Sequence, residues 1–212
     1  MLRAPVGGSF ERQLPEPGMM RARYVAVYDL GTHIDTKFTD DKGRPKKNHL
    51  IQVQWELDQM MEYEGEQKPM MATKRYTLSA HKKSNLRKDL ESHYGKAFND
   101  DDLEKAGGFD VSKLLGRPCL LNIAHSPDGK YANVIGVNPP MKGDAGAAAQ
   151  FYPSRFFELS NPNPDVWATM SQKTREYIAQ SEEVKSGQVK LPSLTITPAP
   201  ESTSDANEDA PY

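Results

Sequence analysis

Five strand-like segments, interrupted once by a helical stretch after the third, limit the folds open to this chain. The clearest is residues 50–57, where every second residue is apolar. Trp55 lies on the apolar side of that segment, so we expect it to be buried rather than to stack on a base. The five segments are residues 19–30, 50–57, 70–78, 118–124 and 131–137. Glycines and charged residues separate them, as is typical of strands joined by turns.

Three strands, a helix and two strands follow one another in the oligonucleotide-binding (OB) fold, a Greek-key β-barrel that binds single strands across its second and third strands. We therefore expect a mainly β chain with a five-stranded OB-fold and a helical insert between strands three and four. The loops expected to flank a site are residues 39–48 and 125–130. The expected divisions are an extended N-terminal arm at 1–18, the OB-fold at 19–142, a linker and helical extension at 143–184, and a disordered acidic tail at 185–212.

Positive charge gathers at the start of the predicted helix. Ser84 is a good N-cap and Gly95 a good stop, with Leu86 and Leu90 on an apolar stripe. Residues 68–96 contain eight Lys or Arg and two acids, a balance of +6 in a chain of formal net charge −2. Cations oppose the dipole at a helix start unless an anion binds there, so the pattern indicates contacts with phosphates. The simpler alternative is a solvated basic face.

The sequence carries no motif of an enzyme or a metal site. Its five histidines share no metal-ligand spacing, and no phosphate-binding loop is present. The acidic triplet at 100–102 follows Asn99, and this order suits a capped helix better than a metal. Cys119 is the single cysteine, and we expect it to be buried in a strand. We therefore expect no catalytic residues, no metal, no cofactor and, without an apolar run of about 18 residues, no membrane segment.

The composition changes after Pro140. Small residues at 143–150 predict a linker, and an aromatic cluster at 151–157 either packs on the barrel or stacks on bases. Residues 165–180 follow Pro164 and predict one helix with a weak apolar stripe. From residue 185 onward Pro, Ser, Thr and acids dominate, as in disordered segments.

The last twelve residues combine four acids with a terminal aromatic residue. They contain no Lys or Arg, and without them the formal balance is 27 − 25 = +2. An acidic tail can simply aid solubility, but a final aromatic ring favours docking to a partner. We expect the tail to recruit partners or to compete with DNA for the basic groove. Its candidate residues are Glu201, Asp205, Glu208, Asp209 and Tyr212.

Two long motifs, RYTLSAHKKSNLRKDLESHYGKAF and GFDVSKLLGRPCLLNIAHSPDGKYANVIGV, resemble a family of bacteriophage-encoded OB-fold proteins that act as single-stranded-DNA-binding or replication proteins. The resemblance covers roughly residues 19–142. It implies a role in DNA replication or recombination in the cytoplasm of an infected bacterium. The tail resembles the partner-recruiting tails of single-strand binders, although it has fewer acids and no final Phe.

The expected ligand is single-stranded DNA bound without sequence preference, with duplex DNA as a second possibility and replication or recombination proteins as partners of the tail. The candidate phosphate contacts are Lys46, Lys47, Lys74, Arg75, Lys82, Lys83, Arg87 and Lys88. The candidate stacking residues are Tyr24, Tyr28, Tyr76 and Tyr131, of which Tyr24 and Tyr28 are expected to be the more exposed. Tyr76 shares a face with Leu78 and is alternatively a core residue. The alternative function is a protein-interaction module whose basic patch binds an acidic protein.

Overall fold

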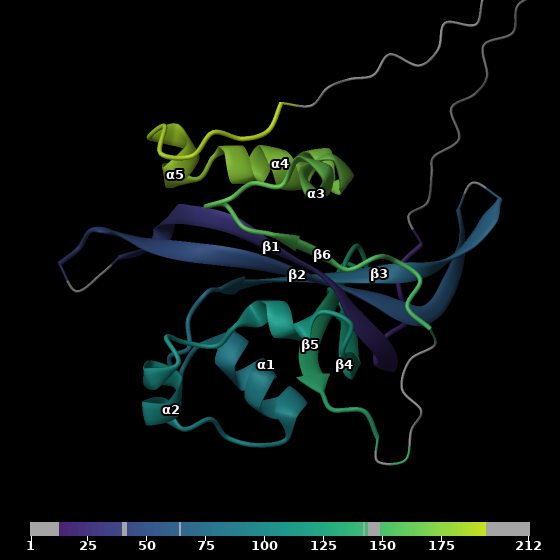
Figure 1. The fold of residues 1–212 in the computed structure, drawn as a ribbon. Helices are drawn as coiled ribbons and strands as arrows, with labels where there is room; N and C mark the ends of the chain where they lie inside the picture. The colour runs from purple at the N-terminus through teal and green to yellow at the C-terminus, as the bar shows by residue number, and fades with distance from the viewer. Residues whose placement is uncertain (1–12, 40–41, 64, 142, 144–148, 194–212) are drawn as a thin grey trace, which may run out of the picture.

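The computed structural model describes residues 13–39, 42–63, 65–141, 143 and 149–193 (Figure 1). Its elements in chain order are β1 (Gly18–Thr39), β2 (Pro45–Tyr63), β3 (Glu66–Thr77), α1 (Asn85–Tyr94), α2 (Asp100–Lys105), the 3-10 helix η1 (Val111–Leu114), β4 (Pro118–His125), β5 (Ala132–Asn138), β6 (Arg155–Phe157), α3 (Pro164–Thr169), α4 (Gln172–Ala179) and α5 (Glu182–Lys185). The prediction of a mainly β chain with helices between its third and fourth strands is confirmed.

The strands form one sheet in the order β3-β2-β1-β4-β5, and the short β6 joins it beside β1. The long strand β1 pairs with three neighbouring strands. Its residues 18–23 pair with β4, residues 22–39 with β2, and residues 26–28 with β6. The pairing with β6 is parallel, whereas the other pairs are antiparallel. β3 and β5, which end the strand order, approach each other.

Helix α1 begins and ends at the residues that its sequence predicts. The Ser84 hydroxyl accepts a hydrogen bond from the Arg87 amide at 3.1 Å, which satisfies one of the unpaired amides of the first turn. Gly95 ends the helix in the left-handed conformation with φ of 62°. Leu86 and Leu90 are buried against the sheet, so the predicted apolar stripe is confirmed.

The sheet is buried on both of its faces. One core lies between the sheet and α1 and contains Trp55 and Cys119, whose predicted burial is confirmed. A second core lies on the other face, where α3, α4 and α5 form a layer over β1 and β2 (Figure 1). Phe157 and Trp167 fill this second core with stacked rings. Phe157 of the aromatic cluster therefore packs on the sheet. Residues 149–193 cover this face of the sheet, and we call them the C-terminal extension.

A β-bulge in β1 changes which residues share a face. A regular alternation through residues 24–28 would place Val25 and Val27 on one face of the strand and Tyr24 and Tyr28 on the other, and the expected exposure of the two tyrosines depends on it. The register with β2 shifts between Tyr24 and Ala26, and as a result Tyr24 joins Val27 in the first core while Tyr28 lies in the second. An extra residue in one strand exchanges the faces that follow it, so the predicted faces were wrong.

The C-terminal extension differs from its prediction in two ways. The single helix predicted at 165–180 is two helices, because the extended backbone of Met170 and Ser171 separates α3 from α4. Ser171 caps α4, and Met170 is buried in the second core. The tail was predicted to begin at residue 185, but Val189 and Leu191 pack on the second core. The extension that packs on the sheet therefore includes Leu191.

A polar cluster ties the extension to the β1–β2 pair. The amide and hydroxyl of Thr32 donate to the Glu183 carboxylate at 2.8 and 2.6 Å. His49 Nε2 lies 2.7 Å from Asp29 Oδ1, and this hydrogen bond raises the pKa of His49. Burial alone would raise the pKa of Asp29, but the hydrogen bonds from His49 and backbone amides outweigh it and lower that pKa. The extension is thus held by charged hydrogen bonds as well as by apolar contacts.

Candidate nucleic-acid interface

Exposed cations come from the start of β2, from β3, from the segment before α1 and from the first turn of α1 itself. We call Lys46, Arg75, Lys83 and Lys88 the basic surface. Leu50 of β2 pairs with Thr77, the last residue of β3, and residues 78–84 then lead into α1. Leu50 and the end of β3 therefore lie beside the start of the helix. A cavity of about 360 Å³ there is lined by Leu50, Arg75, Tyr76, Thr77, Lys83, Ser84 and Asn85.

Three of these cations are available for an anionic ligand. Within the described part of the chain, the side chains of Lys46, Lys83 and Lys88 form no ion pair. Arg75 donates from Nε to Gln52 Oε1 at 3.2 Å and lies over the ring of Tyr177 at 4.0 Å from its centre. Arg75 is therefore oriented by its neighbours while it remains exposed.

Three other predicted phosphate contacts already have acidic partners. Lys47 pairs with Glu182 at 2.7 Å. Lys82 pairs with Asp100 at 2.6 Å, and the half-buried Lys74 pairs with Asp89 at 2.7 Å. A phosphate would have to compete with each carboxylate, which lowers the gain from binding. These lysines are weaker candidates than those of the basic surface.

Arg87 is a structural residue, and its prediction as a phosphate contact was wrong. Its side chain is buried at 4% exposure. The guanidinium donates to Glu91 at 2.8 Å and to Asp100 at 2.5 Å. It also donates to the backbone oxygens of Ala80 at 3.1 Å and Phe98 at 2.6 Å. These bonds connect α1 to the segments before and after it, and they use the donors that a phosphate would need.

Three of the four predicted stacking tyrosines are buried, so their rings are closed to bases. Tyr24 and Tyr28 are each 2% exposed and Tyr76 is 4% exposed. The Tyr76 hydroxyl donates to Asp89 at 2.7 Å. Burial, followed by the charge of Asp89, raises the pKa of Tyr76. The expectation that Tyr24 and Tyr28 are exposed was wrong, because the bulge turns one ring into the first core and the extension covers the other.

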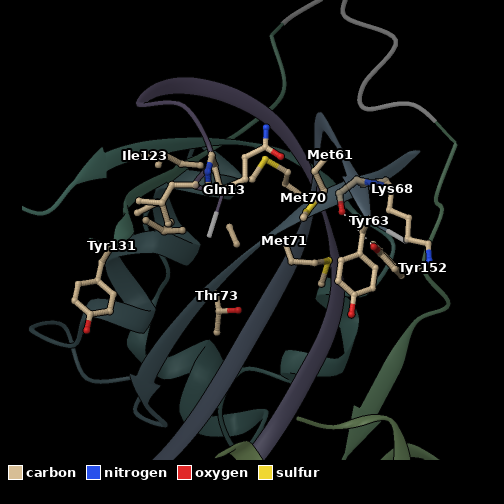
Figure 2. Close-up of a pocket in the computed structure, with 16 residues that line it drawn as sticks. Gln13, Met61, Tyr63, Lys68, Met70, Met71, Thr73, Ile123, Tyr131 and Tyr152 are labelled. Carbon is tan, nitrogen blue, oxygen red and sulfur yellow. Dashed lines mark hydrogen bonds between the residues drawn. The ribbon is translucent and has the colours of Figure 1, made fainter. Parts of the chain in front are cut away.

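Tyr131, at 58% exposure, is the one predicted stacking residue that remains open. It lies at one end of a groove of about 390 Å³ between β3 and β5. Figure 2 shows Tyr131 at one end, Tyr63, Lys68 and Tyr152 at the other, and Met71 and Thr73 between them. We call this cavity the tyrosine groove. Its tyrosines come from three distant parts of the chain, so no spacing in the sequence identifies them as a group.

β3 connects the tyrosine groove to the basic surface. Met71 and Thr73 line the groove, whereas Arg75 and Thr77 line the basic cavity. Alternate residues of a strand point to the same side, so these four side chains form one row about 20 Å long. Three of them are exposed, and Met71 is half-buried. An extended ligand could therefore contact both sites along a single strand.

The extension closes the neighbouring part of the sheet. Gln52 and Glu56 of β2 are buried. Gln52 lies 3.4 Å from Thr174 of α4, and Glu56 accepts hydrogen bonds from the amides of Phe151 and Tyr152. A surface across the second and third strands was expected. The structure leaves β3 open and covers the middle of β2.

The described residues contain no group of three or more His, Cys, Asp or Glu side chains arranged to hold a metal ion. None of the helices in these ranges has both the length and the apolar character needed to cross a membrane. The predicted tail residues, Glu201 to Tyr212, lie outside the described part of the chain. No model of a known protein family matches this sequence, and no curated protein is significantly similar to it.

Proposed function

We propose that this chain is a non-enzymatic protein that binds single-stranded DNA without sequence preference, in phage DNA replication or recombination. The DNA would lie along β3, with phosphates at the basic surface and bases toward the tyrosine groove. The observation that carries the proposal is the row from Met71 to Thr77, which joins exposed cations to exposed aromatic rings. Single-strand binders combine these two features, because phosphates and stacked bases recur along any sequence.

The strand order also supports an OB-fold. In that fold the first strand is shared between the second and the fourth, a helix lies between strands three and four, and the outer strands approach each other. Here β1 pairs with both β2 and β4, α1 lies between β3 and β4, and β3 approaches β5. OB-folds bind oligonucleotides on the second and third strands. In our proposal the DNA contacts the third strand, β3, but does not contact the middle of the second strand, β2, because the extension covers it.

Binding should be tight for single strands and steeply dependent on salt. If four to six phosphates are neutralised, the plot of log affinity against log salt should have a slope of roughly −3 to −4. Fluorescence anisotropy with labelled single-stranded and duplex oligonucleotides of equal length, at several salt concentrations, measures this slope. A slope near zero, or no binding at low salt, would refute the proposal and favour a protein-interaction module.

The acidic tail is proposed to compete with DNA for the basic surface. Deleting Glu201 to Tyr212 removes four acids and no Lys or Arg. We expect the shortened chain to bind single strands more tightly at low salt, with a smaller difference at high salt because salt screens the competing charges. The same anisotropy titration measures both chains. If their affinities are equal at low salt, the tail does not compete with DNA, and recruiting partners remains its proposed role.

A further inference from the structure

We infer that the tyrosine groove binds unpaired nucleobases, with one base against Tyr131 and another against the ring of Tyr63 at the opposite end. This inference rests on the proposed function, and it identifies where the bases of the bound strand lie. Tyr63 is 43% exposed, and no sequence pattern marked it as a contact. The two rings lie at opposite ends of the groove in Figure 2, which leaves separate positions for two bases.

The floor of the groove is apolar and firmly packed. Met70 and Val134 are buried in the first core and form part of the lining. Met71 lies between the two ends, where its flexible thioether can contact a base face. A volume of about 390 Å³ is within the range of pockets that hold small organic ligands. The groove therefore offers apolar contact to a flat ring without a rearrangement of the core.

The charge of the groove favours a base over a phosphate. Among the described residues that line it, Lys68 is the single charged one. Its ammonium pairs with Glu66 at 2.9 Å and lies 5.4 Å from the centre of the Tyr63 ring. This pairing offsets the positive charge and holds Lys68 beside the aromatic ring. The neutral face of a nucleobase can contact the Tyr63 ring there, whereas a phosphate would compete with Glu66 for Lys68.

The groove is also continuous with the basic surface. Thr73 lines the groove, and Arg75 follows two residues later on the same side of β3. A strand whose phosphates contact Arg75 can therefore direct its next bases into the groove. In the described sheet, β3 is hydrogen-bonded to β2 alone. The other edge of its backbone faces the groove, where its amides can donate hydrogen bonds to the polar edge of a base and its carbonyls can accept them.

The test distinguishes the contribution of the bases to binding from that of the phosphates. Full-length protein is titrated with a labelled thymidine strand of about 12 nucleotides, a length within the usual range for one OB-fold, and with an abasic strand of the same length. The variants are Tyr63→Ala, Tyr131→Ala and their combination, with Tyr131→Phe as the conservative exchange. Ile135→Ala is the matched control, because Ile135 is also 58% exposed and lies on β5 outside the groove lining.

The wild-type protein is expected to prefer the thymidine strand by about 5- to 150-fold for each stacked base. The double variant should lose this preference with an unchanged salt slope, whereas Tyr131→Phe and Ile135→Ala should keep it. If wild-type protein binds both strands equally and with a steep salt slope, the base site is refuted, whereas single-strand binding through phosphate contacts at the basic surface stands. A double variant that keeps the preference also refutes the site. Failure to bind either strand refutes the proposed function itself.

Discussion

Exchanging Lys46, Lys83 and Lys88 for glutamine is expected to weaken binding to single strands about 100-fold at about 0.1 M salt. Each lysine that contacts a phosphate contributes about 0.7 to the salt slope, which corresponds to about fivefold in affinity at this salt concentration. Three contacts therefore give about 100-fold, and the slope should become less steep by about 2. The measurement is an anisotropy titration of one labelled strand at four or more salt concentrations.

A second triple variant controls for the change in total charge. Lys105, Lys185 and Lys190 are exposed and lie in α2 or in the C-terminal extension. Exchanging them for glutamine also removes three positive charges, but we expect the salt slope to stay near its wild-type value. If both variants lose affinity equally, then binding depends on net charge alone and the basic surface is not a site. Because all six side chains are exposed, the stability of the fold should change little.

The comparison of Lys83 with Arg87 shows how far charge in the sequence can define a site. Both belong to one basic run, and both were predicted as phosphate contacts. In the structure Lys83 is exposed, whereas Arg87 is buried among acceptors from both flanking segments. Those acceptors include the backbone oxygen of Phe98, and nothing in the local pattern shows where it lies. The charge pattern therefore places both residues in one basic run, but it does not show which of them is exposed.

Local patterns predicted the elements well because their causes are local. The alternation in β2, the Ser84 cap and the Gly95 stop depend on neighbours within a few residues. The prediction that Tyr28 is exposed was wrong because the cause of its burial is not local. Its burial depends on Phe157 and Trp167, more than 100 residues away in the chain. An exposed tyrosine and one covered by a distant segment look the same in a single sequence.

Replacing Gly31 with alanine is expected to destabilise the chain by about 2–5 kcal/mol, through backbone strain and steric overlap together. Gly31 has φ of 76°, a conformation that residues with a Cβ rarely adopt. An added Cβ would lie 2.6 Å from Cβ of Ser181, 2.7 Å from Cδ2 of Leu159 and 2.9 Å from Oε2 of Glu183. All three belong to the extension, so the new methyl group would push the extension from β1. Thermal and urea unfolding measure the loss.

Gly129→Ala is the matched control, because Gly129 has φ of 69° but no atom within 4 Å of an added Cβ. We expect it to cost about 1–2 kcal/mol from strain alone. Equal losses in the two variants would show that the extension does not press on β1 at Gly31. A larger loss for Gly31→Ala with one cooperative transition is the expected result, because β1 contributes to both cores. Two transitions would instead mean that the extension unfolds separately, and its removal would then uncover Gln52 and Glu56 on β2.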